Sequence, residues 1–170
     1  NCIFQGNFNT LLKDLARSSD WLNANHITKE KIETSRFNNE ERILRFFAFY
    51  YEIDQYKGKL ASFLNDFMRT HKDLTEDVKN EYASLLSRSL KVAMKIERLS
   101  TSKNVFEAVL IGIAANISVL ETKGTEDINK LYKDVEGDEN FSEEALKEGL
   151  GSLDKVKNRL NAAKIIFARG

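Results

Sequence analysis

Apolar residues recur at helical spacing along most of the chain. The clearest example is a stripe at positions i, i+3, i+4, i+7 and i+8, which is typical of a helix with one buried face: Leu60, Phe63, Leu64, Phe67 and Met68. No segment alternates convincingly between apolar and polar residues with the period of two that a half-buried β-strand shows. The pattern therefore predicts an all-α protein, a single bundle-like domain of seven to nine helices over residues 1–170.

The sequence RFFAFYY at residues 45–51 places five aromatic side chains in seven positions. Asn38 and Glu41 resemble a capping box that starts this helix at about residue 39, and Gly58 ends it. Platforms that stack nucleic-acid bases need exposed aromatic rings, whereas phenylalanine is usually buried. The stretch is therefore interpreted mainly as core, with some tyrosine hydroxyls free to reach a groove. The predicted core signature is Phe46, Phe47, Tyr50, Phe63, Phe67 and Phe106.

Three further long helices are predicted. Thr75, followed by two acidic residues, starts a helix to about Leu99, because its hydroxyl can accept from free backbone N–H groups while the acids favour the positive end of the helix. The helix at about 102–122 is apolar on all sides and is expected to be central. Hydrophobic staples are expected at Ile27-Thr28 and Phe141-Ser142. The apolar face of the last helix carries Leu153, Val156, Leu160, Ala163 and Phe167.

Composition supports this fold class and shows one charge asymmetry. The chain has no proline, which suits helices because proline removes a backbone donor and clashes with the preceding turn. The formal net charge is zero, but residues 121–148 contain ten acidic residues and four lysines. This segment is predicted to be an acidic, mobile lobe. A zero net charge gives no general support for binding to a polyanion.

The chain carries few signs of its cellular setting. Its single cysteine, Cys2, cannot form an internal disulfide, and together with the absence of a signal peptide this predicts a cytoplasmic protein that does not enter a membrane. The longest apolar run, 105–120, is too short and too polar for a good membrane span. The sequence starts without methionine, so we expect a fragment of a larger protein.

No catalytic constellation is visible in the sequence. His26 and His71 lack partners at the spacing of a known metal motif, so both are interpreted as surface or capping residues, and no metal site is predicted. There is no phosphate-binding glycine loop, nucleophile elbow or His-Asn-His nuclease pattern. We therefore expect no cofactor and no enzymatic activity of this chain itself.

One basic pattern is a candidate for contact with DNA phosphates. Four bases are predicted to share one side of the helix after Thr75: Arg88, Lys91, Lys95 and Arg98. A second basic set lies on the last helix: Lys155, Arg159 and Lys164. Such stripes are more often the solvated side of an amphipathic helix, so both interpretations stay open.

Four sequence blocks resemble the helical region that follows the ParB/sulfiredoxin-like domain in the family called domain of unknown function 262. The blocks are NCIFQGNFNTLLKDLA at 1–16, EERILRFFAFYYEIDQYKG at 40–58 with Arg36 before it, KLASFLNDFM at 59–68 and NVFEAVLIGIA at 104–114. They cover about the first two thirds of the chain, in the order of the family. GmrSD-type modification-dependent restriction systems belong to this group.

The resemblance implies a function without implying a catalytic residue. The Asp-Gly-Gln-Gln-Arg motif of the family's N-terminal domain is absent here, as is the nuclease that completes some members. The family thus implies a non-catalytic helical module of a restriction-like, anti-phage protein that supports a ParB-like nuclease or NTPase domain of the same polypeptide and helps it engage DNA. The alternative is a protein–protein interaction or dimerisation module, a homo-oligomer included, without DNA contact.

Overall fold

The computed structural model describes residues 5–170, and within these residues the fold is all-α, as predicted. Nine α-helices and three short 3₁₀ segments follow one another, and the described residues contain no strand. The α-helices are α1 (Asn7–Ala16), α2 (Ser19–Ala24), α3 (Ile32–Glu52), α4 (Leu60–His71), α5 (Glu76–Ala93), α6 (Lys103–Ala115), α7 (Ile117–Leu120), α8 (Thr125–Gly137) and α9 (Leu153–Phe167). The 3₁₀ segments are η1 (Lys29–Lys31), η2 (Ile53–Gln55) and η3 (Glu139–Phe141).

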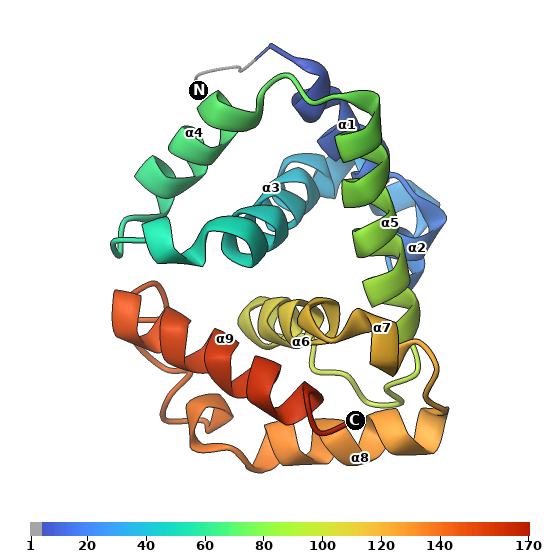
Figure 1. Cartoon of the computed structure of the whole chain (residues 1–170), viewed down its shortest axis with the longest axis vertical. Coiled ribbons are helices and arrows are strands. Elements are labelled where there is room, and N and C mark those ends of the chain that lie inside the picture. Colours follow the sequence, from blue (N-terminus) through green and yellow to red (C-terminus); the bar gives the residue numbers. More distant parts are fainter. Residues whose placement is uncertain (1–4) are drawn as a thin grey trace.

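The helices form two groups joined along one side by α5. Helices α1 to α4 lie at one end of the molecule, and α6 to α9 lie at the other (Figure 1). Helix α6 is the central element, since it packs against α3, α5 and α9. Most of its residues are buried, as the apolar sequence predicts. The buried apolar side chains form one cluster that draws on helices from α1 to α9.

Helix α3 begins earlier than the capping signals predicted. Thr28 precedes η1, which continues directly into α3 at Ile32. Asn38 and Glu41 therefore lie inside the helix, and the prediction that they cap it is wrong. The expected break is absent because Ile32–Asn38 contains neither glycine nor proline, so one helix continues through the segment.

Two other boundaries differ from the sequence prediction. Helix α5 begins as expected, with the Thr75 hydroxyl accepting from the N–H of Val78, but it ends at Ala93 instead of Leu99. The predicted helix 102–122 is divided at Asn116 into α6 and α7. The Asn116 side chain donates to the carbonyl oxygens of Gly112 and Lys164, at 2.9 and 3.2 Å, and so fixes the division against α9.

Aromatic packing fills the space between α1, α3, α4 and α5. The Phe47 ring lies 4.7 Å from that of Tyr82 and 6.2 Å from that of Phe8, measured between centroids. Of the predicted core signature, five side chains are buried: Phe46, Phe47, Phe63, Phe67 and Phe106. Tyr50 is only half-buried, whereas Tyr56 is buried and its hydroxyl donates to the carbonyl oxygen of Gly151.

Helices α6 and α9 approach each other closely at Gly112. A Cβ atom placed on Gly112 would lie 2.8 Å from the carbonyl carbon and oxygen of Ala163, and 2.9 Å from a ring carbon of Phe167. Only a glycine therefore allows this backbone approach without a shift of α9. The predicted apolar face of α9 supplies the other side of the contact, with Val156, Leu160, Ala163 and Phe167 buried.

The acidic segment 121–148 contains a packed helix. Helix α8 buries Ile128, Leu131, Tyr132 and Val135 and contacts α9. The staple predicted at Phe141-Ser142 starts no regular helix, although the Ser142 hydroxyl accepts from the N–H of Ala145. Cys2 lies outside the described residues. No helix of the described part is both long and apolar enough to span a membrane.

Candidate functional site

The four bases predicted to form one stripe do not lie on one helix. Arg88 and Lys91 belong to α5, whereas Lys95 and Arg98 lie beyond its end at Ala93. The predicted stripe on a single helix is therefore wrong. Helix α5 stops because Asn129 of α8 binds the backbone that follows, accepting from the N–H of Glu97 and donating to the carbonyl oxygen of Lys95.

Two of these four bases are engaged within the protein. Arg88 forms a two-pronged ion pair with Glu121, at 2.8 and 2.6 Å, and the pair lowers the pKa of the Glu121 carboxyl through its hydrogen bonds. Lys95 donates to the carbonyl oxygen of Lys123 at 2.6 Å. Lys91 and Arg98 are exposed. The acidic segment thus takes up part of the predicted stripe, which leaves two separate bases for a partner.

The second basic set on the last helix is also not a solvated stripe. Arg159 is 2% exposed and donates to the carbonyl oxygen of Leu150 at 3.2 Å, while its Nε has no acceptor among the described residues. Burial lowers the pKa of the Arg159 guanidinium, and the charge of Glu107 opposes that change. Lys155 donates to the carbonyl oxygens of Ala145 and Glu148. Both residues therefore support the local fold.

An ion pair with a buried carboxylate and a half-buried guanidinium joins the aromatic helix to the central helix. Arg45 of α3 donates to both carboxylate oxygens of Glu107 of α6, at 2.7 and 2.9 Å. Burial opposes the charge on Arg45, but the hydrogen bonds and the charge of Glu107 outweigh it and raise the pKa of the guanidinium. The negative charge of Glu107 also favours the charged forms of Arg42 and Arg159, which burial disfavours. One carboxylate therefore balances three arginines.

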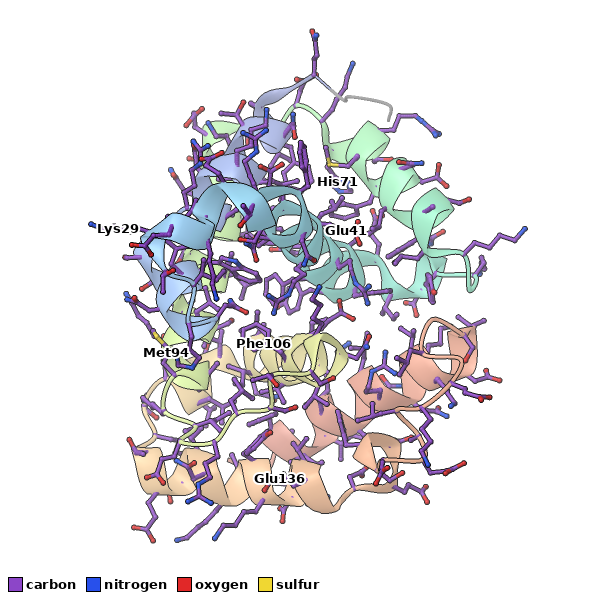
Figure 2. All side chains as sticks on the ribbon, turned by 180° about the vertical axis from the view of Figure 1, so that it is seen from behind. Lys29, Glu41, His71, Met94, Phe106 and Glu136 are labelled. Atoms are coloured by element: carbon purple, nitrogen blue, oxygen red, sulfur yellow. The ribbon has the colours of Figure 1, made fainter. Side chains whose placement is uncertain are left out.

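Two adjoining cavities lie beside this ion pair and share Arg42, Lys103 and Phe106. We call them together the Arg42 groove. The outer cavity, of about 370 Å³, is lined from α2, the α5–α6 connection and the start of α6, and its wall includes His26, Met94, Arg98 and Leu99. The inner cavity, of about 180 Å³, lies between α3 and α6, and its wall includes Trp21, Glu41, Arg45, Phe46, Glu107 and Leu110. Met94, Phe106 and Glu41 mark the groove in Figure 2.

Arg42 lies against two aromatic rings, which contact each other edge-to-face, where the cavities meet. Its guanidinium carbon lies 5.0 Å from the centroid of Trp21 and 5.1 Å from that of Phe106, distances at which a cation is attracted to the ring faces. Burial lowers the pKa of Arg42, and no carboxylate among the described residues forms an ion pair with it. The aromatic rings thus fix the position of a guanidinium whose donors are not used by an acidic side chain.

The groove also holds the start of α6. The Ser102 side chain makes no capping hydrogen bond, and the first turn contains no acidic residue but begins with the exposed Lys103. The first N–H groups of a helix lack acceptors within the helix and carry partial positive charge. Arg42, Lys103 and this helix end therefore place positive charge on one wall of the groove, while Glu97 lines the outer cavity and Glu41 the inner one.

His26 gives the outer cavity an unusual backbone. Its φ is 52°, in the left-handed region where glycine is usual, and it follows the end of α2. Its N–H donates to the carbonyl oxygen of Asn23, and the N–H of Ile27 donates to that of Leu22, which is the hydrogen-bond pattern of a Schellman helix end. His26 is thus a capping residue, one of the two roles expected for it. The ring of His71 instead stacks on Phe67, with a centroid distance of 4.0 Å.

The sequence interpretation did not select Arg42 or Lys103. The available signal was Arg42 and Arg45 on the aromatic helix, three positions apart, but which face would meet α6 depended on tertiary packing. Among residues 5–170 no group of three or more histidine, cysteine or acidic side chains is arranged to hold a metal ion. No family model, curated protein or solved structure matches the chain. The resemblance to the domain of unknown function 262 family therefore stays a prediction.

Proposed function

We propose that this chain is a non-catalytic helical module of a larger, restriction-like DNA-targeting protein, and that it contacts nucleic acid through the Arg42 groove. The observation that supports DNA contact most directly is the grouping of Arg42, Arg98 and Lys103 round one groove at the start of α6. Cationic side chains and helix N-termini are the usual partners of backbone phosphates. The resemblance in the first two thirds of the chain supports the rest of the proposal.

Salt-dependent binding of duplex DNA tests the contact. Each phosphate contact contributes about 0.9 to the slope of log affinity against log salt, so Arg98→Gln with Lys103→Gln should lower the slope by up to about two units. The loss should be similar for all DNA sequences, because phosphate contacts carry little sequence information. Both side chains are exposed, so the fold should tolerate their replacement.

A matched control removes two positive charges elsewhere. Lys57, in the segment before α4, and Arg69, in the last turn of α4, are exposed, and neither lines the groove. Lys57→Gln with Arg69→Gln should leave the salt slope unchanged. Equal effects of the two double variants would refute the groove as the DNA contact. Lys91→Gln is a separate test of the exposed base on α5, which the groove does not include.

The proposed partner domain has its own test. In the full-length protein, an Asp-Gly-Gln-Gln-Arg motif should lie in a ParB-like domain upstream of Asn1. That domain and this chain, produced separately, should form a complex. A full-length sequence without such a domain would contradict the family assignment, whatever the outcome of the DNA experiment.

The alternative function is a protein–protein interaction or dimerisation module without DNA contact. The observation that favours it is the exposure of large apolar side chains: Phe37 of α3 is 74% exposed and Ile165 of α9 is 63% exposed. Such side chains gain stability when a partner covers them. Under this alternative, molar mass rises with protein concentration in sedimentation, and Phe37→Ser or Ile165→Ser reverses the rise. A constant monomer mass would refute self-association.

A further inference from the structure

We propose that the inner cavity of the Arg42 groove binds a phosphomonoester, the terminal phosphate of a nucleic-acid strand or of a nucleotide. The inference deepens the proposed function and rests on it, because it names the chemical group that the same groove takes. The proposed ligand is a terminal phosphate, not a phosphate within the continuous backbone.

The donors are already held in position. Arg42 lies against the rings of both Trp21 and Phe106, so binding a ligand would cost little of the side-chain freedom that a mobile arginine loses. A planar guanidinium offers two parallel N–H groups to a phosphate, and the bond is strengthened by charge. Lys103 and the uncapped start of α6 lie on the same wall. Trp21 also lines the inner cavity, and its buried Nε1 has no acceptor among the described residues.

The acidic residues of the cavity do not cancel this charge. Both carboxylate oxygens of Glu107 are occupied by Arg45, so that pair is internally neutral. Glu41 is exposed and lines the inner cavity, so its negative charge repels an anion that binds there. In the inner cavity the positive charges of Arg42 and Lys103 are therefore opposed by Glu41 and, at Arg42, by the charge of Glu107, which the charge of Arg45 counters in turn. Removal of the Glu41 charge should strengthen binding, which provides a variant that acts in the opposite direction.

The size of the two cavities favours a phosphate attached to one group. Pockets for drug-sized ligands have volumes of about 300–1,000 Å³. The inner cavity, at about 180 Å³, is below that range and is lined by the buried side chains of Trp21, Phe46 and Leu110. A phosphodiester in a continuing strand has substituents on both sides, whereas a phosphomonoester has one. The outer cavity, at about 370 Å³, has room for the attached nucleoside.

Fluorescence of Trp21 offers a direct measurement, because it is the only tryptophan in the chain and lies in the wall of the cavity. The probes are inorganic phosphate, a mononucleotide, and short single strands with and without a 5′- or 3′-phosphate. We expect the phosphorylated strands to bind at least about tenfold more tightly than the unphosphorylated strand, a factor that one charge-assisted hydrogen bond can supply. The mononucleotide distinguishes a free nucleotide from a strand end as the source of the phosphate.

Single replacements show which residues the phosphate-dependent change in Trp21 fluorescence depends on. Arg42→Gln and Lys103→Gln should each remove most of the preference for phosphate, and Glu41→Gln should increase affinity. Lys103 is exposed, so its replacement tests the proposal even if Arg42→Gln does not fold. Arg69→Gln, on the surface of α4, is the control with the same charge change and should bind like the unaltered chain.

Two results would overturn the inference: equal affinity for phosphorylated and unphosphorylated strands, or a phosphate preference that Lys103→Gln leaves intact. Duplex binding that depends on the groove but shows no preference for a terminal phosphate refutes the inference and leaves the proposed function standing. A phosphate preference that depends on Arg42, without any binding of duplex DNA, supports the inference and refutes the proposed function.

Discussion

Replacement of Glu107 by glutamine tests whether one carboxylate stabilises the centre of the fold. Glu107 is 8% exposed, and its two oxygens accept from Arg45 at 2.7 and 2.9 Å. It also opposes the charges of Arg42 and Arg159, which burial already disfavours. In Glu107→Gln these three cations keep their positions while their nearby anion is lost. Breaking a buried ion pair in this way costs about 3–5 kcal/mol, and we expect a loss in this range.

Urea denaturation followed by circular dichroism measures the loss. With a slope of about 2 kcal/mol per molar urea, the midpoint of Glu107→Gln should fall by about 1.5–2.5 M. The matched control is Glu121→Gln, because Glu121 binds Arg88 with the same two-pronged geometry, at 2.8 and 2.6 Å, but on the surface. Exposed pairs contribute little, since water replaces the lost partner, so the control should unfold near the midpoint of the unaltered chain.

A double replacement separates the ion pair from its surroundings. Arg45→Met with Glu107→Leu removes both charges, and apolar replacement of a buried pair is often neutral or stabilising. Here Arg42 and Arg159 would still lack a counter-charge, so we expect only partial recovery. If Glu107→Gln lowered the midpoint no further than Glu121→Gln, or if the double replacement recovered full stability, the idea of one carboxylate balancing three arginines would be refuted.

Two further predictions concern packing and pH. Gly112→Ala should destabilise the fold by about 1–3 kcal/mol and lower the melting temperature, because its Cβ would overlap Ala163. The control is Gly137→Ala, whose Cβ would have no neighbour within 4 Å, and it should lower the melting temperature far less. Burial, with help from Glu81, raises the pKa of Tyr82 from 10.0 to about 12, so the folded state holds this proton more tightly than the unfolded chain does. Stability is then full below pH 10 and falls as the pH rises toward 12. Tyr82→Phe should shift alkaline unfolding to higher pH; an unchanged midpoint would contradict this.

Local signals in the sequence predicted the fold class and several helix ends. Thr75 starts α5, because a cap depends on a few neighbouring residues. Gly58 has the left-handed φ of 86° that glycine favours, but α3 ends at Glu52 and is followed by η2, so the prediction that Gly58 ends the aromatic helix is wrong. The end of α5 could not be predicted in this way. It depends on Asn129, which binds the backbone at Lys95 and Glu97 from a distant helix.

The candidate groove was less accessible to sequence reasoning than the core. Helical spacing identified the aromatic residues as core, because apolar periodicity reports burial directly. It could not show that Arg42 would lie against both Trp21 and Phe106, since these three residues come from α2, α3 and α6. The same limit applied to Arg159. Its charge suggested a surface position, but its side chain is buried under the 3₁₀ and turn segments before α9. Long-range packing decided both outcomes.

The close crossing of α6 and α9 has a consequence for synthesis of the chain. Ala163, which covers Gly112, follows it by about 50 residues, and a ribosome adding about 5–20 residues per second needs roughly 3–10 seconds to make them. During this interval α6, the most apolar helix of the protein, lacks its main neighbour α9. The nascent chain therefore exposes apolar side chains that are buried in the folded protein. Chaperone capture should therefore be strongest for chains stalled between α6 and α9, and it should decline once α9 has left the ribosome.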